Sequence, residues 1–245
     1  MEKMNVIAII QARTGSTRLP NKIFYELSEK PLLFHVVERI KPSSEIDQIV
    51  VATTKSENDD LINNWAKENG IYCFRGSEKN VLKRYYYAAE KYDADLIVRI
   101  TADDPFKDYR IIDNAVRIIK EKNFDFVCNN NPVSFPEGLD VEVLTMNSLK
   151  KSFQNSKTNF EKEHVTQYIH LNRNKFKVFN IKNNINLSHY RWTLDTFEDY
   201  NFTKQIYDNL YIKGKIFLTE DIYKLLEQKP FLLDINKNVK KSTLY

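Results

Sequence analysis

The sequence has little of several residue types that mark large classes of protein. It holds two cysteines, Cys73 and Cys128, which stand far apart in apolar runs and form neither a disulfide framework nor a zinc-binding CxxC pair. No apolar segment reaches the ~18 residues of a membrane-spanning helix. The apolar start at residues 6–10 is too short for the core of a signal peptide. We therefore expect a cytoplasmic protein without a membrane partner.

An excess of charge of one sign is also missing. Lysine and arginine total 37 against 33 aspartates and glutamates, which leaves a net charge of +4. Nucleic-acid-binding proteins normally carry clustered basic stripes, so this weak charge argues against a nucleic-acid partner. Hydrophobic residues make up 42% of the chain, as in an ordinary folded protein. The mild basic balance is compatible with an anionic small-molecule substrate.

Short apolar runs alternate with helical patterns through the first half of the chain. The runs predict strands buried on both faces at 6–10, 48–53, 71–74, 96–101 and 124–128. Between them, apolar residues with helical spacing predict helices at 31–40, 57–69, 81–92 and 109–122. We expect Gly70 to follow the second helix and Asp108 to cap the fourth. This order predicts an α/β fold with a Rossmann-like, mostly parallel sheet and helices on both faces.

The second half of the chain is less regular. After a turn-rich loop at 129–138, the pattern predicts strands at 139–145, 176–181 and 190–195, and helices at 159–172, 196–210 and 219–228. Thr196 and Thr219 are expected to cap the last two helices. We expect one domain over residues 1–245, in which about residues 130–190 extend the sheet and add a small antiparallel arm.

The stretch "QARTGSTRLPNK" (11–22) is a dense cationic turn directly after the first predicted strand. It therefore lies at the carboxyl edge of the sheet, where α/β proteins bind ligands. Arg13 and Arg18 can fork onto phosphate oxygens, Lys22 adds a point charge, and Gly15 lets the backbone approach a ligand. The stretch matches neither GxxxxGK[ST] nor GxGxxG. It fits a triphosphate whose own charge balances the three cations; the alternative is a solvated basic loop.

Aspartates end two further predicted strands. Asp103 and Asp104 close "RITADDPF" (99–106), and Asp195 follows "YRWTL". Carboxylates at this edge of the sheet are the ligands by which Mg²⁺ bridges protein and nucleotide. Because adjacent residues point to opposite faces, one member of the Asp103–Asp104 pair is expected to bind metal and the other to support it. The alternatives are caps of the following segments.

A last group of titratable residues lies in "FPEGLDVEV" (135–143) and "EKEHVTQYIH" (161–170). The group comprises Glu137, Asp140, Glu142, Glu163 and His164. Asp140 and Glu142 are two residues apart, share a strand face and could both line a pocket. His164 could orient a substrate or act as a base, although a lone helical histidine more often serves packing. We find no Ser-His-Asp triad and no zinc-binding cluster.

Taken in order, these motifs resemble the cytidylyltransferases that activate acidic sugars. The similarity runs from about residue 5 to 210. Its motifs are "IAIIQARTGSTRLPNKIF", "LLFHVVERI", "IVVATT", "RGSEKNVLKRYYYAA", "VRITADDPF", "FPEGLDVEVL", "EHVTQYI" and "RWTLDTFEDY". They are most similar to the spore coat polysaccharide F branch, which is related to the 3-deoxy-manno-octulosonate and N-acylneuraminate cytidylyltransferases.

The resemblance implies a nucleotidyltransferase fold of the GT-A-like type, and transfer of CMP from CTP to an acceptor with release of pyrophosphate and with Mg²⁺ as cofactor. Its catalytic residues would be Arg13, Lys22, Asp103 and Asp195, of which Asp103 and Asp195 bind the metal. Further nucleotide contacts would be Gly15, Ser16, Arg18, Ala52, Thr53, Gly76, Ser77 and Thr101. Acceptor contacts would be Asp104, Glu137, Asp140, Glu142, Glu163, His164 and Arg191. The resemblance also implies a homodimer that pairs through the 130–190 arm.

Two departures from the family pattern bear on the substrate. Asn80 stands where many relatives have an acid, and the "SGTDR" segment of the octulosonate enzymes is absent, which argues against that sugar. The acceptor would be a keto sugar acid, a smaller sugar acid or a polyol phosphate destined for a surface polysaccharide such as a capsule or lipopolysaccharide. The acidic lining favours a hydroxyl-rich or amino-bearing acceptor.

Two competing functions fit parts of the pattern. A GT-A-type glycosyltransferase could use "ADD" to bind the metal of a nucleotide-sugar, but it does not need the cationic turn. A non-catalytic nucleotide-binding or partner-binding protein has no evident use for both Asp103 and Asp195.

Overall fold

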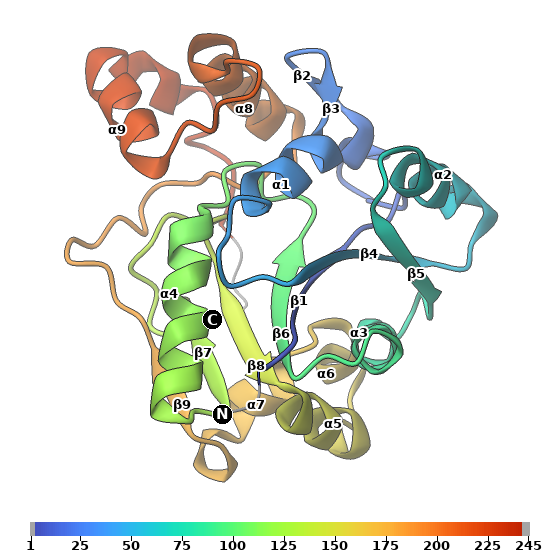
Figure 1. Cartoon of the computed structure of the whole chain (residues 1–245). Coiled ribbons are helices and arrows are strands. Elements are labelled where there is room, and N and C mark those ends of the chain that lie inside the picture. The colour runs from blue at the N-terminus through green and yellow to red at the C-terminus, as the bar shows by residue number, and fades with distance from the viewer. Residues whose placement is uncertain (1–2, 242–245) are drawn as a thin grey trace.

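The fold is built around one seven-stranded sheet, which the computed structural model describes together with its helices over residues 3–241 (Figure 1). Its strand order is β5-β4-β1-β6-β8-β7-β9. The strands are β1 Val6–Gln11, β4 Gln48–Thr54, β5 Tyr72–Gly76, β6 Leu96–Thr101, β7 Phe126–Cys128, β8 Glu142–Thr145 and β9 Val178–Asn180. Strand β8 is antiparallel to both of its neighbours and the other pairs are parallel, so the predicted mostly parallel α/β sheet is confirmed.

Helices cover both faces of the sheet. They are α1 Leu32–Ile40, α2 Asp60–Glu68, α3 Val81–Lys91, α4 Tyr109–Lys122, α5 Met146–Asn155, α6 Asn159–Glu163, α7 Gln167–Leu171, α8 Phe197–Leu210 and α9 Thr219–Gln228. Short 3₁₀ turns lie at η1 Lys22–Phe24, η2 Glu57–Asp59, η3 Arg173–Lys175 and η4 Pro230–Asp234. None of the helices within residues 3–241 is long and apolar enough to cross a membrane.

The central strand β1 is apolar over residues 6–10 and does not alternate apolar with polar residues there, because both of its faces are covered. Val6, Ala8 and Ile10 pack into the core beneath α1, α4 and α8. Ile7 and Ile9 point the other way, into a second core beneath α3 and α5 (Figure 1). Successive side chains of a strand point to opposite faces, so a strand covered on both sides needs apolar residues throughout.

Several local predictions are confirmed. Gly70 follows α2 with a φ of +66°, a left-handed conformation that favours glycine. The carboxylate of Asp108 accepts a hydrogen bond from the Arg110 amide at the start of α4. The Thr196 hydroxyl caps α8 in the same way. The predicted cap at Thr219 is wrong, because its hydroxyl donates instead to Asp108, 2.8 Å away.

Other elements differ from the prediction. Helix α5 and a small hairpin, β2 Glu26–Leu27 with β3 Lys30–Pro31, were not predicted. The helix expected at 159–172 is broken into α6 and α7, because Val165 between them adopts a φ of +42°. The strand expected at 190–195 is an extended segment that carries only an isolated bridge from Glu137 to Arg191.

Two long loops within residues 130–190 lie against each other. The Leu187 amide donates to the Ser134 carbonyl at 2.9 Å, and the Glu137 amide donates to the Tyr190 carbonyl at 3.1 Å. The Trp192 amide then donates to the Glu137 carbonyl at 2.8 Å. These bonds carry the segment before α8 to the carboxyl edge of the sheet.

Candidate active site

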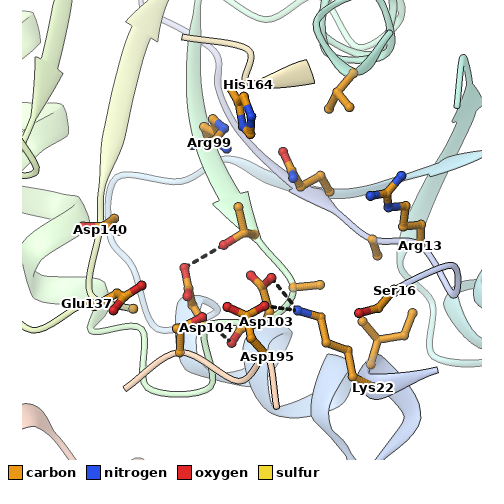
Figure 2. Close-up of a pocket in the computed structure, with 18 of the residues that line it drawn as sticks. Arg13, Ser16, Lys22, Arg99, Asp103, Asp104, Glu137, Asp140, His164 and Asp195 are labelled. Carbon is orange, nitrogen blue, oxygen red and sulfur yellow. Dashed lines mark hydrogen bonds and ion pairs between the residues drawn. The ribbon is translucent and has the colours of Figure 1, made fainter. Parts of the chain in front are cut away.

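A cavity of about 590 Å³ opens at the carboxyl ends of β1 and β6 (Figure 2). The turn after β1, the acids after β6, the segment before β8 and the segment before α8 all contribute to its wall. The structure therefore brings together most of the residues that the sequence singled out. Those in the wall are Arg13, Ser16, Arg18, Lys22, Thr101, Asp103, Asp104, Glu137, Asp140, Glu142, Glu163, His164 and Asp195.

Six of the expected contact residues are not in the wall, namely Gly15, Ala52, Thr53, Gly76, Ser77 and Arg191. Some act on it indirectly. A Cβ atom on Gly76 would lie 2.9 Å from Cγ of Arg84, so the glycine makes room for that arginine. The guanidinium of Arg84 donates a 2.6 Å hydrogen bond to the Ser77 carbonyl. Arg84 itself lines the cavity. Arg84 was not singled out from the sequence.

The centre of the site is an ammonium group between two carboxylates. Nζ of Lys22 lies 2.7 Å from Asp103 and 2.8 Å from Asp195, and donates a third bond to the Leu194 carbonyl at 3.0 Å. Arg18 also pairs with Asp195, at 2.9 Å. The expectation that only the nucleotide balances the cationic turn is therefore wrong for these two cations: distant aspartates of the chain itself neutralise them.

The electrostatics of this centre follow from the geometry. Burial on its own would raise the pKa of Asp103, but the adjacent Lys22 ammonium outweighs that effect and lowers it to about 2. Burial on its own would lower the pKa of Lys22, but the two carboxylates outweigh burial and raise it. Asp103 and Lys22 are therefore both ionised at neutral pH.

Arg13 differs from its two neighbours in the turn. Among residues 3–241, no carboxylate pairs with it. Asp59 holds the turn that carries Arg13. Its carboxylate accepts hydrogen bonds from the Thr14 amide at 2.8 Å and from the Thr14 hydroxyl at 2.7 Å. The turn thus presents an exposed, uncompensated guanidinium at the mouth of the cavity, as an anion site requires.

The second acid after β6 has a separate set of partners. Asp104 accepts a 2.6 Å bond from Thr101 and pairs with Lys107 at 2.8 Å. The nearest cation is therefore Lys22 for Asp103 and Lys107 for Asp104, and the assignment of one acid to a metal stays a prediction. Lys107 is almost fully buried, lines the cavity and was missed in the sequence, where nothing but its position after "ADDPF" distinguished it.

Glu142 is the hub of a buried network rather than an open acid. It pairs with Arg99 at 2.6 Å and with His170 at 3.1 Å, and accepts a 3.0 Å bond from Thr166. These partners hold its pKa well below the usual range despite its burial. Arg99 lies beside His164 in the wall (Figure 2), so the acceptor end is less acidic than the sequence indicated. Sequence reasoning missed Arg99. The signal that could have found it is a charged residue within the apolar run 96–101, which predicts a strand buried on both faces.

Arg191 acts beneath the site. It pairs with Asp199 at 2.8 Å, with Glu137 at 3.0 Å and with Asp195 at 3.2 Å. Its side chain is buried and lies outside the wall, so it positions Glu137 and Asp195 rather than reaching into the cavity.

Comparison with known proteins gives a consistent set of matches. A family model described as cytidylyltransferase matches residues 7–238. The spore coat polysaccharide biosynthesis protein SpsF of Bacillus subtilis (strain 168) is 33% identical over 211 residues, covering 83% of this chain and 86% of that protein. The structure of a cytidylyltransferase from Leptospira borgpetersenii serovar Hardjo-bovis is 34% identical in sequence and has a TM-score of 0.90. The match covers 98% of this chain and 99% of that chain.

The same fold occurs in a more distant enzyme. The structure of CMP:2-keto-3-deoxy-manno-octonic acid synthetase complexed with CTP has a TM-score of 0.61 at 15% identity. The match covers 82% of this chain and 98% of that chain.

Proposed function

The chain belongs to the cytidylyltransferase family, as its motifs predicted, and we propose that it uses CTP and Mg²⁺ to activate a sugar, sugar acid or polyol phosphate for a surface polysaccharide. The observation that carries the proposal is the convergence of Asp103 and Asp195 on one cation, in the same cavity wall as Arg13. The SpsF relative is named for spore coat polysaccharide biosynthesis, and this name supports a surface polysaccharide as the destination of the product.

The cationic turn would bind the triphosphate. Arg13 is available for phosphate oxygens as it stands. Lys22 has all three of its N–H donors engaged, so it must give up at least one protein partner to reach the nucleotide. Arg13, and Lys22 once it has released a partner, would stabilise the charge that builds on the α-phosphate and on the departing pyrophosphate.

The donor set of the site fits Mg²⁺. Asp103 and Asp195 present carboxylate oxygens to a common point, where the Lys22 ammonium shows that a cation is accommodated. Among residues 3–241, no group of three or more histidine, cysteine, aspartate or glutamate side chains is arranged to hold a metal. Two carboxylates therefore suit a metal that takes its other ligands from phosphate and water. When bound, the ion would neutralise charge on the phosphates.

A glycosyltransferase with the same sheet is the second candidate, because Asp103 and Asp104 could form its metal site. Asp104, however, pairs with Lys107, whereas Asp103 pairs with Lys22. A nucleotide-sugar enzyme also has no need of the exposed Arg13. Both observations favour nucleotidyl transfer.

The test is a pyrophosphate-release assay of the four nucleoside triphosphates against sugar acids and polyol phosphates, with Mg²⁺ present. We expect release with CTP, and a loss of about 10²–10³-fold in the Asp103→Asn variant. Asp208→Asn on the exposed face of α8 is the matched control and should retain activity. Hydrolysis of nucleotide-sugars without release of pyrophosphate would contradict the proposal.

A further inference from the structure

Asp140 occupies a position that the fold directs into the cavity. Its neighbours Leu139 and Val141 are both 1% exposed and pack into the core beneath α4. In an extended chain, alternate side chains point to opposite sides, so the residue between two core residues faces away from the core. Asp140 accordingly lines the cavity, and Figure 2 shows it beside Glu137.

The backbone around Asp140 is held rigidly. The side-chain amide of Asn129 donates to the Leu139 carbonyl at 2.9 Å and accepts from the Val141 amide at 2.7 Å. The Asn129 side chain therefore makes the two hydrogen bonds that a neighbouring strand would otherwise make to the residues before and after Asp140. The ammonium of Lys107 also donates to the Asp140 carbonyl. Asn129 is fully buried, so this clamp fixes the place from which the Asp140 carboxylate projects.

The Asp140 carboxylate has no hydrogen-bond or ion-pair partner among residues 3–241. The other acids at this end are engaged: Asp104 by Lys107, Glu137 by Arg191 and Glu142 by Arg99. These three acids and Lys107 are the charges that face Asp140. Burial, reinforced by the acids against the opposing Lys107, raises the pKa of Asp140 to about 7.

We propose that Asp140 is the proton acceptor for the acceptor substrate, which therefore attacks through a hydroxyl group and not through a phosphate or carboxylate. The inference rests on the proposed function and names the reacting group of its second substrate. An unpaired carboxylate that projects from a hydrogen-bonded backbone into the wall of an active site has the geometry of a general base.

The step balances with the two substrates alone. The acceptor hydroxyl oxygen forms a bond to the α-phosphorus of CTP and its proton passes to a carboxylate oxygen of Asp140. The bond from the α-phosphorus to the bridging oxygen breaks, and pyrophosphate leaves with that electron pair. The products are a CMP ester and pyrophosphate, and Asp140 later returns its proton to solvent.

The charge at this end of the cavity argues against an anionic nucleophile. A phosphate or carboxylate oxygen is already ionised at neutral pH and needs no base. It would also approach Asp140 with Glu137 and Asp104 close by, and like charges at short range repel each other. A neutral hydroxyl meets no such barrier and gains a hydrogen bond to Asp140.

The first test identifies the linkage. Wild-type enzyme is incubated with CTP, Mg²⁺ and 3-deoxy-manno-octulosonate, N-acetylneuraminate or glycerol 3-phosphate, and products are analysed by ³¹P NMR. Attack by a hydroxyl gives a CMP phosphodiester whose signal has no phosphorus–phosphorus coupling. Coupled doublets from a new diphosphate linkage would overturn the inference while leaving the proposed function intact. Wild-type enzyme that releases no pyrophosphate with CTP would remove the proposed function, and this inference with it.

The second test concerns the proton. In Asp140→Asn we expect kcat to fall by about 10²–10⁴-fold, with the acidic limb of the pH profile near neutrality lost. Calorimetric CTP affinity should stay within about twofold, because the nucleotide turn lies elsewhere in the wall. Asp208→Asn should match wild type in every measurement. An Asp140→Asn variant that keeps wild-type kcat, or keeps the acidic limb, would overturn the inference.

Discussion

The ammonium of Lys22 lies 2.7 Å from a carboxylate oxygen of Asp103, although 81 residues separate them in the chain. The same ammonium lies 2.8 Å from Asp195, 173 residues away. A turn after β1, an acid after β6 and an acid before α8 thus form one ion cluster before any nucleotide is bound. The cluster keeps the carboxylates that would bind metal in place, and it keeps Lys22 beside the phosphates it would contact.

Replacing Lys22 by methionine removes a buried cation from between two half-buried acids. We expect the free energy of unfolding to fall by about 3 kcal/mol, since an uncompensated buried charge is costly. Because the empty position suits a divalent cation, Mg²⁺ alone should raise the melting temperature of Lys22→Met more than that of wild type. Thermal unfolding with and without Mg²⁺ measures both effects.

The matched control is Lys204→Met, which breaks an exposed pair with Asp208. Such pairs contribute little, so its stability should be near that of wild type and independent of Mg²⁺. Equal responses of the two variants to Mg²⁺ would show that the Lys22 position is not a cation site.

Arg13 should separate catalysis from stability. It is exposed and has no ion pair within the described part of the chain, so Arg13→Ala should leave the free energy of unfolding within about 0.5 kcal/mol of wild type. Turnover with CTP should fall by about 10²–10³-fold. Arg117→Ala, an exposed arginine on α4, is the control for loss of positive charge. Comparable turnover in the two variants would refute the role given to Arg13.

Asp140 gives a prediction for stability against pH. Because its pKa is raised to about 7, the folded state retains between about pH 4 and 7 a proton that the unfolded state has released. Its contribution to stability therefore decreases as pH rises through this window. Asp140→Asn should remove the decrease and be more stable than wild type at pH 8, by roughly 2–4 kcal/mol. Urea unfolding of both proteins at pH 5, 6, 7 and 8 measures the difference, and a constant difference would contradict the prediction.

Gly138 is required where the backbone before β8 meets the segment before α8. A Cβ atom there would lie 2.7 Å from the carbonyl carbon of Trp192, and its φ is +102°. Gly214 also has a positive φ, +79°, but nothing lies within 4 Å. We expect Gly214→Ala to cost about 1 kcal/mol from φ alone, and Gly138→Ala about 4 kcal/mol because overpacking is added. Equal costs in chemical denaturation would show that the close approach is not restrictive.

The sheet and the place of the site were predictable because both follow from local pattern. Continuous apolar runs such as 6–10 signal strands covered on both faces, and polar residues directly after such runs lie at the carboxyl edge. Arg13, Lys22 and Asp103 all follow such runs, and they line one cavity. The position of a residue at this edge follows from the run before it and does not depend on the order of the strands in the sheet.

What the sequence could not show were partnerships between distant segments. Residues 190–195 alternate apolar and polar side chains as a strand does, but Trp192 and Leu194 bond to different parts of the chain. The Leu194 amide donates to the Asp103 carbonyl at 2.8 Å, whereas Trp192 bonds to Glu137. The ladder that would define a strand never forms.

The break between α6 and α7 has a similar origin. Apolar spacing continues across 159–172, yet the Thr166 hydroxyl bonds to Glu142 on β8, and His170 reaches the same carboxylate. Periodicity reports which face of a helix is apolar and carries no information on such hydrogen bonds. Glu142 lines the cavity together with Asp140, as the sequence indicated, but for the same reason the pattern gave no sign that it is also the hub of a buried network.

Following the label from CTP tests the central claim most directly. With CTP labelled at the α-phosphorus, the account predicts that the label appears in the acceptor product, and with CTP labelled at the γ-phosphorus, that it appears in pyrophosphate. Both transfers should require Mg²⁺ and be lost in Asp103→Asn. Label that remains in CTP for every acceptor, or γ-label released as orthophosphate without pyrophosphate, would contradict cytidylyl transfer at this site.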